Sequence, residues 1–348
     1  MKSDNPFSLT FGMLPYKVIS RYEEKNNVVS TFNAQNAVSH IFLIEGIRGS
    51  GKTVLMTSIS DELCVNKDWI GVDLNPAVDL LDNLAECLVN SMNIFPDILG
   101  NGFSISAMGF GIGVNGSDKK SSIGIIEEIL ERLKKKGKKL IITIDEVTPS
   151  QNMRVFASQF QIFLRKKYPV FLLMTGLYEN IYNIQNDSSL TFLLRAPKIK
   201  LGALSLMQIA REYEDIFSID IEEASLMARE TKGYAFAFQA FGMLLWEYGV
   251  TDFTNNKKLF SEYEALLDDF AYKKIWTELT KKEQNIVLSI EDNRSMKASE
   301  ICSAIGMSNS LFSQYRKKLI DKGILSSPSY GYVELTLPRL HKICRYYE

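Results

Sequence analysis

One short stretch constrains the fold of this chain more than any other. Residues 46–53 read GIRGSGKT and fit the phosphate-binding loop pattern G-x-x-x-x-G-K-[ST]. The run before it, residues 40–44, is apolar and β-branched, which predicts a buried strand. Residues 54–59 have the composition of the first turns of a helix. A strand, a glycine loop and a helix in this order predict an α/β fold with a phosphate-binding loop.

The residue types in this loop suit the binding of nucleotide phosphates. Glycines let backbone N–H groups turn inward around phosphate oxygens, and the helix N-terminus adds its positive dipole end. Lys52 can reach the β- and γ-phosphates, and the Thr53 hydroxyl can bind Mg²⁺. The predicted nucleotide-binding residues of the loop are Gly46, Ile47, Arg48, Gly49, Ser50, Gly51, Lys52, Thr53 and Val54.

A second signal lies in residues 138–146. The run 140–144 predicts a buried parallel strand, and Asp145 and Glu146 follow it directly. At the C-terminal end of a parallel strand these carboxylates would face the ligand crevice. Asp145 is then placed to hold Mg²⁺, and Glu146 to polarise an attacking water. The alternative is a strand followed by a solvated acidic turn.

A third apolar strand is predicted at residues 168–174, and Thr175 follows it. Two interpretations of Thr175 stay open. Its hydroxyl can touch the γ-phosphate or the attacking water, or it can simply cap the end of the strand.

Composition narrows the class of protein. A chain of 348 residues suggests two or three domains. The formal net charge of −1 provides no global field toward nucleic acid or membrane, so such binding requires a local patch. The four cysteines lack metal-site spacing and are expected to be reduced, mostly buried thiols. With neither a signal-peptide pattern nor a long apolar run, the sequence predicts a cytoplasmic protein with no membrane partner.

The second half of the chain predicts helices and then a small mixed module. Residues 202–248 have helical patterning, and the apolar stretch 235–246 predicts a buried helix. Residues 280–335 predict a capped helix, a helix–turn–helix and a hairpin, which resembles a winged helix-turn-helix domain. A glycine-rich hairpin is predicted at residues 103–115.

If the winged helix binds double-stranded DNA, polar and basic side chains of its second helix would meet phosphates and base edges. These are Ser308, Asn309, Ser310, Ser313, Gln314, Arg316 and Lys317. The alternative is a winged helix that contacts protein or only packs.

Taken together, the loop, the strand that ends in Asp-Glu and the later strand that ends in a polar residue resemble the AAA+ ATPases. The segments 5–12 and 15–23 resemble the entry segment of origin-recognition-type and STAND-like prokaryotic ATPases. The resemblance implies ATP and Mg²⁺ as ligands. It also implies a nucleotide-binding core at 1–201, a helical lid at 202–272 and a winged-helix domain at 273–348.

Three further positions follow from this resemblance. Arg21 would lie beside the adenine, although Ser20 stands where these families usually have glycine. Arg195, just before the last core strand, would be an arginine finger for a neighbouring subunit; the alternative is a surface arginine at a helix end. Phe236 stands where a lid arginine is usual, which implies slow or partner-dependent hydrolysis.

The predicted function is therefore ATP hydrolysis with Mg²⁺, coupled to DNA binding through the winged helix. The alternative is a STAND-like switch in signalling or defence, controlled by ATP or ADP, whose winged helix contacts protein. Either function allows a homo-oligomer or a separate protein partner.

Overall fold

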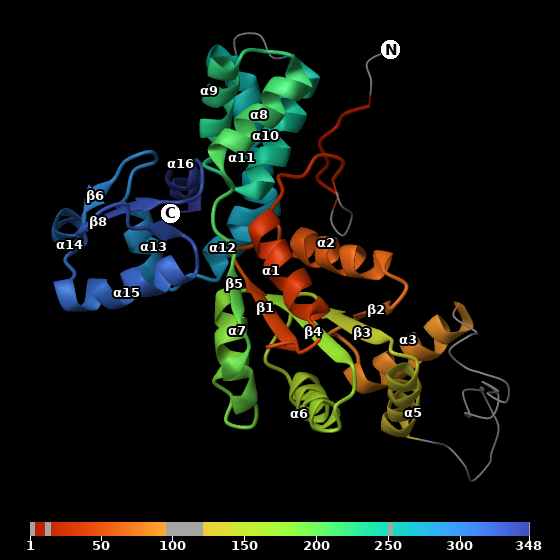
Figure 1. Cartoon of the computed structure of the whole chain (residues 1–348). Helices are drawn as coiled ribbons and strands as arrows, with labels where there is room; N and C mark the ends of the chain where they lie inside the picture. Colours follow the sequence, from red (N-terminus) through yellow and green to blue (C-terminus); the bar gives the residue numbers. More distant parts are fainter. Residues whose placement is uncertain (1–3, 11–14, 95–120, 250–252, 348) are drawn as a thin grey trace. The chain divides into compact units, whose positions relative to one another are not determined.

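The computed structural model describes residues 4–10, 15–94, 121–249 and 253–347 (Figure 1). The chain forms two compact units. The sheet unit comprises Tyr22–Glu45 and Lys52–Lys200, and the helical unit comprises Met1–Arg21, Gly46–Gly51 and Leu201–Glu348. The hairpin predicted at 103–115 lies outside the described residues.

A five-stranded parallel sheet organises the sheet unit, in the order β2-β3-β4-β1-β5. The predicted α/β class with a parallel sheet is confirmed. Its strands are β1 (Ile41–Glu45), β2 (Trp69–Leu74), β3 (Lys139–Ile144), β4 (Val170–Gly176) and β5 (Lys198–Lys200). The predicted strand at 168–174 is displaced by two residues at each end, because Pro169 has no N–H for the ladder and the pairing with β1 continues to Gly176.

The central strands β1, β3 and β4 are covered on both faces and are buried almost throughout, whereas the outer strands β2 and β5 alternate buried and exposed residues. Helices α1 (Tyr22–Asn33) and α2 (Lys52–Val65) cover one face (Figure 1). There the Phe32 ring lies 4.9 Å from that of Phe171 and 5.5 Å from that of Phe42. The other face packs on α3 (Leu80–Ile94), α5 (Ser122–Lys135), α6 (Gln151–Arg165) and α7 (Tyr178–Gln185). Each fully buried aliphatic side chain contributes about 2 kcal/mol.

Four helices begin the C-terminal part of the helical unit: α8 (Leu206–Phe217), α9 (Ile221–Thr231), α10 (Ala235–Tyr248) and α11 (Lys257–Leu267). As predicted, α10 is buried along most of its length. Phe7 of the N-terminal segment packs on it, with its ring 5.5 Å from that of Phe238. A Cβ at Gly242 would lie 2.3 Å from the Phe7 ring, so only glycine lets the segment dock so closely.

The remaining chain forms short helices and a small antiparallel sheet of order β6-β8-β7. A π-helical turn η4 (Asp268–Tyr272) joins α11 to α12 (Lys273–Thr277). The elements that follow are α13 (Lys281–Leu288), β6 (Met296–Lys297), α14 (Ala298–Ile305), α15 (Asn309–Asp321), β7 (Leu325–Ser326), β8 (Tyr332–Leu335) and α16 (Leu340–Cys344). The predicted helices and hairpin of this region are present; the division of the chain at residue 272 stays a prediction.

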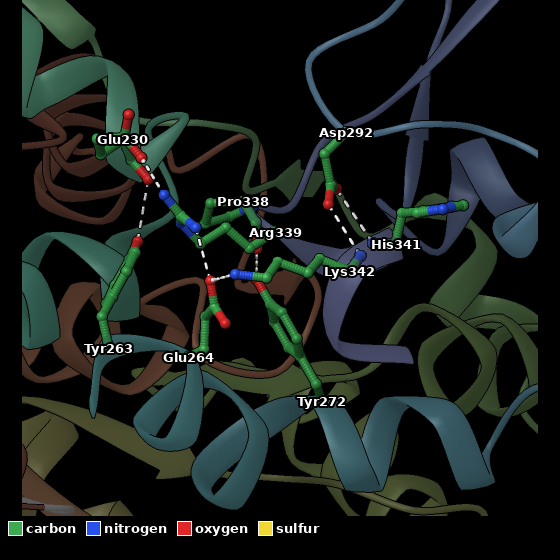
Figure 2. A network of polar contacts seen from close by, with 9 residues as sticks. All are labelled: Glu230, Tyr263, Glu264, Tyr272, Asp292, Pro338, Arg339, His341 and Lys342. Atoms are coloured by element: carbon green, nitrogen blue, oxygen red, sulfur yellow. Dashed lines mark hydrogen bonds and ion pairs between the residues drawn. The ribbon is translucent and has the colours of Figure 1, made fainter. Parts of the chain in front are cut away.

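A polar network joins the C-terminal segment to the helices before it (Figure 2). The Arg339 guanidinium donates to Glu264 at 2.6 Å and to Glu230 at 3.2 Å, and its Cζ atom lies 4.1 Å from the centre of the Phe260 ring. Tyr272 donates to the Pro338 carbonyl at 2.7 Å. Charged hydrogen bonds of this kind are stronger than neutral ones, so they fix residues 338–342 on α9 and α11.

A buried capping box begins α13. Glu283 accepts from the Thr280 N–H at 2.8 Å and from Lys322 at 2.9 Å, and only 1% of Glu283 is exposed. Burial alone would raise the pKa of Glu283, but the hydrogen bonds from Thr280 and Lys322 outweigh it and hold the pKa below its ordinary value. The ionised carboxylate therefore stabilises the fold above pH 4–5, and this contribution is lost as the pH falls through the lowered pKa.

We expect Glu283→Gln to lower the free energy of unfolding by about 3 kcal/mol, because it leaves the Lys322 ammonium buried opposite a neutral group. Urea unfolding at neutral pH measures the loss. The matched control is Glu291→Gln, since Glu291 makes an exposed ion pair with Arg294 and its loss should change little. Equal effects of both substitutions would show that the capping box adds nothing beyond a surface pair.

Candidate functional site

The sheet unit brings together a hydroxyl and a carboxylate from distant parts of the sequence. Thr53 lies in the first turn of α2, and Asp145 follows β3. Strand β4 lies between β1 and β3, so the carboxyl ends of all three meet at one edge of the sheet. There the Thr53 hydroxyl donates to Asp145 Oδ2 at 2.7 Å. A hydroxyl and a carboxylate are hard oxygen ligands, the kind that Mg²⁺ prefers.

Thr175, at the end of β4, completes this arrangement. Its buried hydroxyl donates to Asp145 Oδ1. The Glu146 N–H donates to Asp145 Oδ1 at 2.9 Å and to Thr175 Oγ1 at 3.2 Å. Glu146 itself has φ +51°, and its side chain is exposed. The backbone of Glu146 is thus fixed by two hydrogen bonds, and the residue is exposed at the edge of the sheet.

Residues 46–51 of the phosphate-binding loop belong to the helical unit, where hydrogen bonds from the start of α10 hold them. The Tyr234 hydroxyl donates to the Arg48 carbonyl at 2.8 Å, and the Phe236 N–H donates to the Gly49 carbonyl at 3.0 Å. Burial raises the pKa of Tyr234, so its hydroxyl stays a donor across the physiological range. Gly49 and Gly51 have φ of +73° and +88°, which glycine adopts without strain.

Arg21 holds the loop from its other side. It donates to the Ser50 carbonyl at 3.3 Å and to the Gly202 carbonyl at 2.7 Å, and so ties the loop to the start of the helical segment. The Ser50 hydroxyl is buried and has no hydrogen-bond partner among the described residues. An unpaired buried hydroxyl in such a loop suits an additional oxygen acceptor such as a phosphate.

The loop also contacts the C-terminal part of the helical unit. Arg48 lies 3.9 Å from Glu278, next to α12, and a Cβ at Gly323 would lie 3.7 Å from Ile47. Neither Tyr234 nor Glu278 was predicted as a site residue. Both act through tertiary contacts, Tyr234 on a backbone carbonyl, and the loop motif itself carries no sign of them.

The other predicted nucleotide-site residues lie as follows. Lys52 begins α2 and is 8% exposed, and Val54 is half-buried in the same turn. Arg195 is exposed at the end of the 3-10 turn η2 (Thr191–Arg195), directly before β5. Among the described residues, no hydrogen bond or ion pair joins Arg195 to Thr53 or Asp145. This fits either a finger for another subunit or a surface arginine.

The residues predicted to meet DNA gather on α15 and its N-cap. Ser308 caps the helix by accepting from the Leu311 N–H, and Ser313 donates to the Asn309 carbonyl at 2.8 Å. Arg316 donates to Ser327, in the segment after β7. Most of this set is exposed: Ser308, Asn309, Ser310, Ser313, Gln314 and Lys317.

Two further findings limit other kinds of site. Within the described ranges, no group of three or more His, Cys, Asp or Glu side chains is arranged to hold a metal ion. None of the helices in that part of the chain combines the length and the apolar character needed to cross a membrane.

Known proteins relate to this chain mainly through the fold. The Walker-type ATPase of Pyrococcus abyssi matches with a TM-score of 0.65 at 14% identity, over 94% of this chain and 96% of that one. The ORC2 protein of Aeropyrum pernix, solved as ADPNP–ADP complexes, matches with a TM-score of 0.60 at 14% identity, over 97% and 96%. Cdc6p from Pyrobaculum aerophilum matches with a TM-score of 0.50 at 14% identity, over 97% and 96%.

Sequence comparison adds one short match. Residues 270–342 match a family described as a domain of unknown function, DUF8462. No curated protein matches the chain. The chain therefore shares its fold with the Walker-type ATPase and the ORC2 protein, and the predicted resemblance is confirmed at the level of the fold.

The contact between the loop and Tyr234 can be tested with paired glycine substitutions. A Cβ at Gly49 would lie 2.3 Å from the Tyr234 hydroxyl, whereas a Cβ at Gly51 meets nothing closer than 3.8 Å. We expect Gly51→Ala to cost about 1–2 kcal/mol of unfolding free energy from backbone strain alone. Gly49→Ala should cost about 1–3 kcal/mol more, because of the clash.

Tyr234→Phe removes the clashing oxygen. It should recover part of the loss in the Gly49→Ala background and none in the Gly51→Ala background, as measured by urea unfolding. Equal losses for both alanine variants would mean that Tyr234 does not confine the loop.

Proposed function

We propose that this chain is an ATP-binding AAA+ ATPase that hydrolyses ATP with Mg²⁺. The observation that carries the proposal is the hydrogen bond between Thr53 and Asp145 at the carboxyl edge of the sheet, directly after a glycine loop. A phosphate-bound Mg²⁺ requires oxygen ligands. Thr53 at the start of α2 and Asp145 at the end of β3 provide two of them. The nucleotide-bound state of the ORC2 relative is consistent with this proposal.

Each residue has a distinct chemical role in this mechanism. When bound, Mg²⁺ neutralises charge on the β- and γ-phosphates. The Lys52 ammonium supplies a further positive charge, and the N–H groups of the glycine loop orient the phosphate oxygens. The exposed Glu146 carboxylate orients and polarises the attacking water. Thr175 keeps Asp145 and the Glu146 backbone in register through its hydroxyl.

Arg195 is proposed as a finger that completes the site of a neighbouring subunit. Its exposure at the end of η2 makes it accessible to another molecule. A positive charge added at the γ-phosphate from another subunit, beyond those of Mg²⁺ and Lys52, would make hydrolysis depend on assembly. The division into a core at 1–201, a lid at 202–272 and a winged-helix domain at 273–348 belongs to the same proposal.

Coupling to the C-terminal domain is supported by the contacts of the loop. Tyr234 and Phe236 of the lid hold the carbonyls of Arg48 and Gly49, and Arg48 faces Glu278. A change in the loop on nucleotide binding must therefore change these contacts. We propose that the C-terminal module is a winged helix that binds duplex DNA through α15, with an affinity that depends on the bound nucleotide.

A second candidate is the nucleotide-controlled switch. It is favoured by Phe236, which provides an apolar side chain where a lid arginine would read the γ-phosphate, and whose N–H is already bonded to Gly49. Slow hydrolysis that DNA does not accelerate would favour the switch over the DNA-linked ATPase.

Lys52→Ala should weaken ATP binding by at least about 100-fold, because the phosphates lose the ammonium of the loop. Binding of a fluorescent ATP analogue measures it. Lys198→Ala is the matched control, since Lys198 is an exposed lysine of the same unit outside the loop, and it should bind normally. Undiminished affinity of the Lys52 variant would contradict the assignment of the loop.

Glu146→Gln should leave ATP and Mg²⁺ binding unchanged and lower the hydrolysis rate by at least about 100-fold, because an amide cannot polarise water as a carboxylate does. Phosphate release under single-turnover conditions measures the rate. Glu179→Gln, an acidic residue of α7 in the same unit, is the control and should hydrolyse normally. Normal turnover by the Glu146 variant would remove this residue from the catalytic role.

The DNA role is tested by Arg316→Ala with Lys317→Ala. The pair should weaken duplex binding and flatten its salt dependence by about one unit of slope per lost phosphate contact. The double variant Lys257→Ala, Lys258→Ala, with two exposed lysines of α11 in the same unit, is the control. If the Arg316, Lys317 variant and the Lys257, Lys258 variant bind duplex equally well, the C-terminal module is a protein-contact module.

A further inference from the structure

The amino-terminal edge of the sheet carries a dense positive charge that the proposed function does not use. The turns that precede β2, β3 and β4, with the last residues of α5 and α6, comprise residues 66–68, 134–138 and 165–169, here called the basic edge. They contain eight lysines and arginines and one aspartate, whereas the whole chain has a formal net charge of −1. This edge lies about 20 Å from the carboxyl edge, the length of a six-residue strand.

Parallel pairing brings the three turns side by side. The Lys139 N–H donates to the Asp68 carbonyl at 2.7 Å, and the Leu140 N–H donates to the Pro169 carbonyl at 2.8 Å. Side chains add to this: Lys138 donates to the Lys67 carbonyl at 2.8 Å. The three turns therefore form one continuous surface on the sheet unit.

Structural roles account for only part of the charge. Helices α2, α5 and α6 all end at this edge, and three helix C-termini carry together about −1.5 elementary charges. Lys138 pairs with Asp68, and Lys166 pairs with Glu127. The formal surplus in the turns is +7, so most of it is not neutralised by these groups.

The remaining charges point to solvent. Six basic residues remain and all are exposed, among them the four considered next: Lys135, Lys136, Arg165 and Lys167. In the parts of the chain that the structure describes, none of the four has a carboxylate within 4.0 Å. Like charges held close together on a fixed edge repel one another, and a polyanion would relieve that repulsion.

We propose that the basic edge binds the phosphate backbone of duplex nucleic acid, independently of sequence. Its width across β2, β3 and β4 is about 10 Å, which spans about three phosphates along one strand. Lysine dominates the edge, and lysine binds phosphates as a point charge without reading bases. This inference goes beyond the proposed function, and it requires neither ATP hydrolysis nor DNA binding by α15.

A membrane or a protein partner fits this surface less well. Tyr168, the aromatic residue of the third turn, is buried, so it cannot insert into a bilayer or anchor a protein interface. Val65, at the border of the first turn, is exposed, but one valine provides little apolar area for a membrane anchor.

The test uses the full chain and a fluorescein-labelled duplex of about 30 base pairs and random sequence, titrated at about 50 to 200 mM salt. The variant Lys135→Gln, Lys136→Gln, Arg165→Gln should bind at least about tenfold more weakly, and its salt slope should fall by about 2 to 3. The control Lys198→Gln, Lys257→Gln, Lys258→Gln removes the same charge elsewhere and should change affinity less than about twofold. Urea unfolding should show that both variants fold, with a loss of at most about 1 kcal/mol for each charge removed from a helix C-terminus in the edge variant, because none of these side chains is buried.

Three results would overturn the inference: no duplex binding by the wild type at the lowest salt, an unchanged slope in the edge variant, or equal losses in edge variant and control. Binding to vesicles with phosphatidylserine but not to duplex would identify a membrane surface instead and would also overturn it. The Arg316→Ala, Lys317→Ala variant separates this inference from the proposed function. A loss of duplex affinity in that variant alone supports DNA binding by α15 only. A loss of duplex affinity in the edge variant alone supports binding by the basic edge only.

Discussion

Burial of the parallel sheet on both faces is the constraint on which the rest of the sheet unit depends. Helices on either side exclude water from the central strands β1, β3 and β4, so the polar side chains that face solvent lie at the ends of these strands. The order of the strands places β4 between the loop strand β1 and the carboxylate strand β3. Asp145 can therefore reach both Thr53 and Thr175 across the same edge. The opposite edge receives the three turns before β2, β3 and β4. Parallel pairing of these strands therefore also brings the lysines of the turns side by side.

In the helical unit, the loop is held by hydrogen bonds that other residues donate to its backbone carbonyls. Arg21 bonds to Ser50, and the start of α10 bonds to Arg48 and Gly49. Further along, Arg339 ties the C-terminal segment to α9 and α11 (Figure 2). The loop, helices α9 to α11 and the C-terminal segment thus belong to one connected set of contacts, through which a change in the loop can reach the C-terminal segment.

The sequence predicts the strands, most helices and the central pair of the site, because these depend on local patterns. Apolar runs, the glycine loop and the Thr280–Glu283 capping box each specify their structure within a few residues. The contacts of Tyr234 and Glu278 could not be predicted in this way, since their partners lie about 190 to 230 residues away in the sequence and one partner is a carbonyl that every residue has. Likewise, the basic edge is three ordinary helix ends in the sequence, and only parallel pairing makes it one surface.

The left-handed backbone of Glu146 has a consequence for how this site tolerates change. A residue with a Cβ costs about 1 kcal/mol in that conformation, and glycine or asparagine adopts it at lower cost. Two requirements, the left-handed backbone and the carboxylate, therefore conflict at this position, because glycine suits the backbone best and has no carboxylate. A screen for thermal resistance alone should enrich glycine or asparagine at position 146, while selection for turnover should restore glutamate. Under the role proposed for Glu146, stability and activity are thus set against each other at a single residue of this edge.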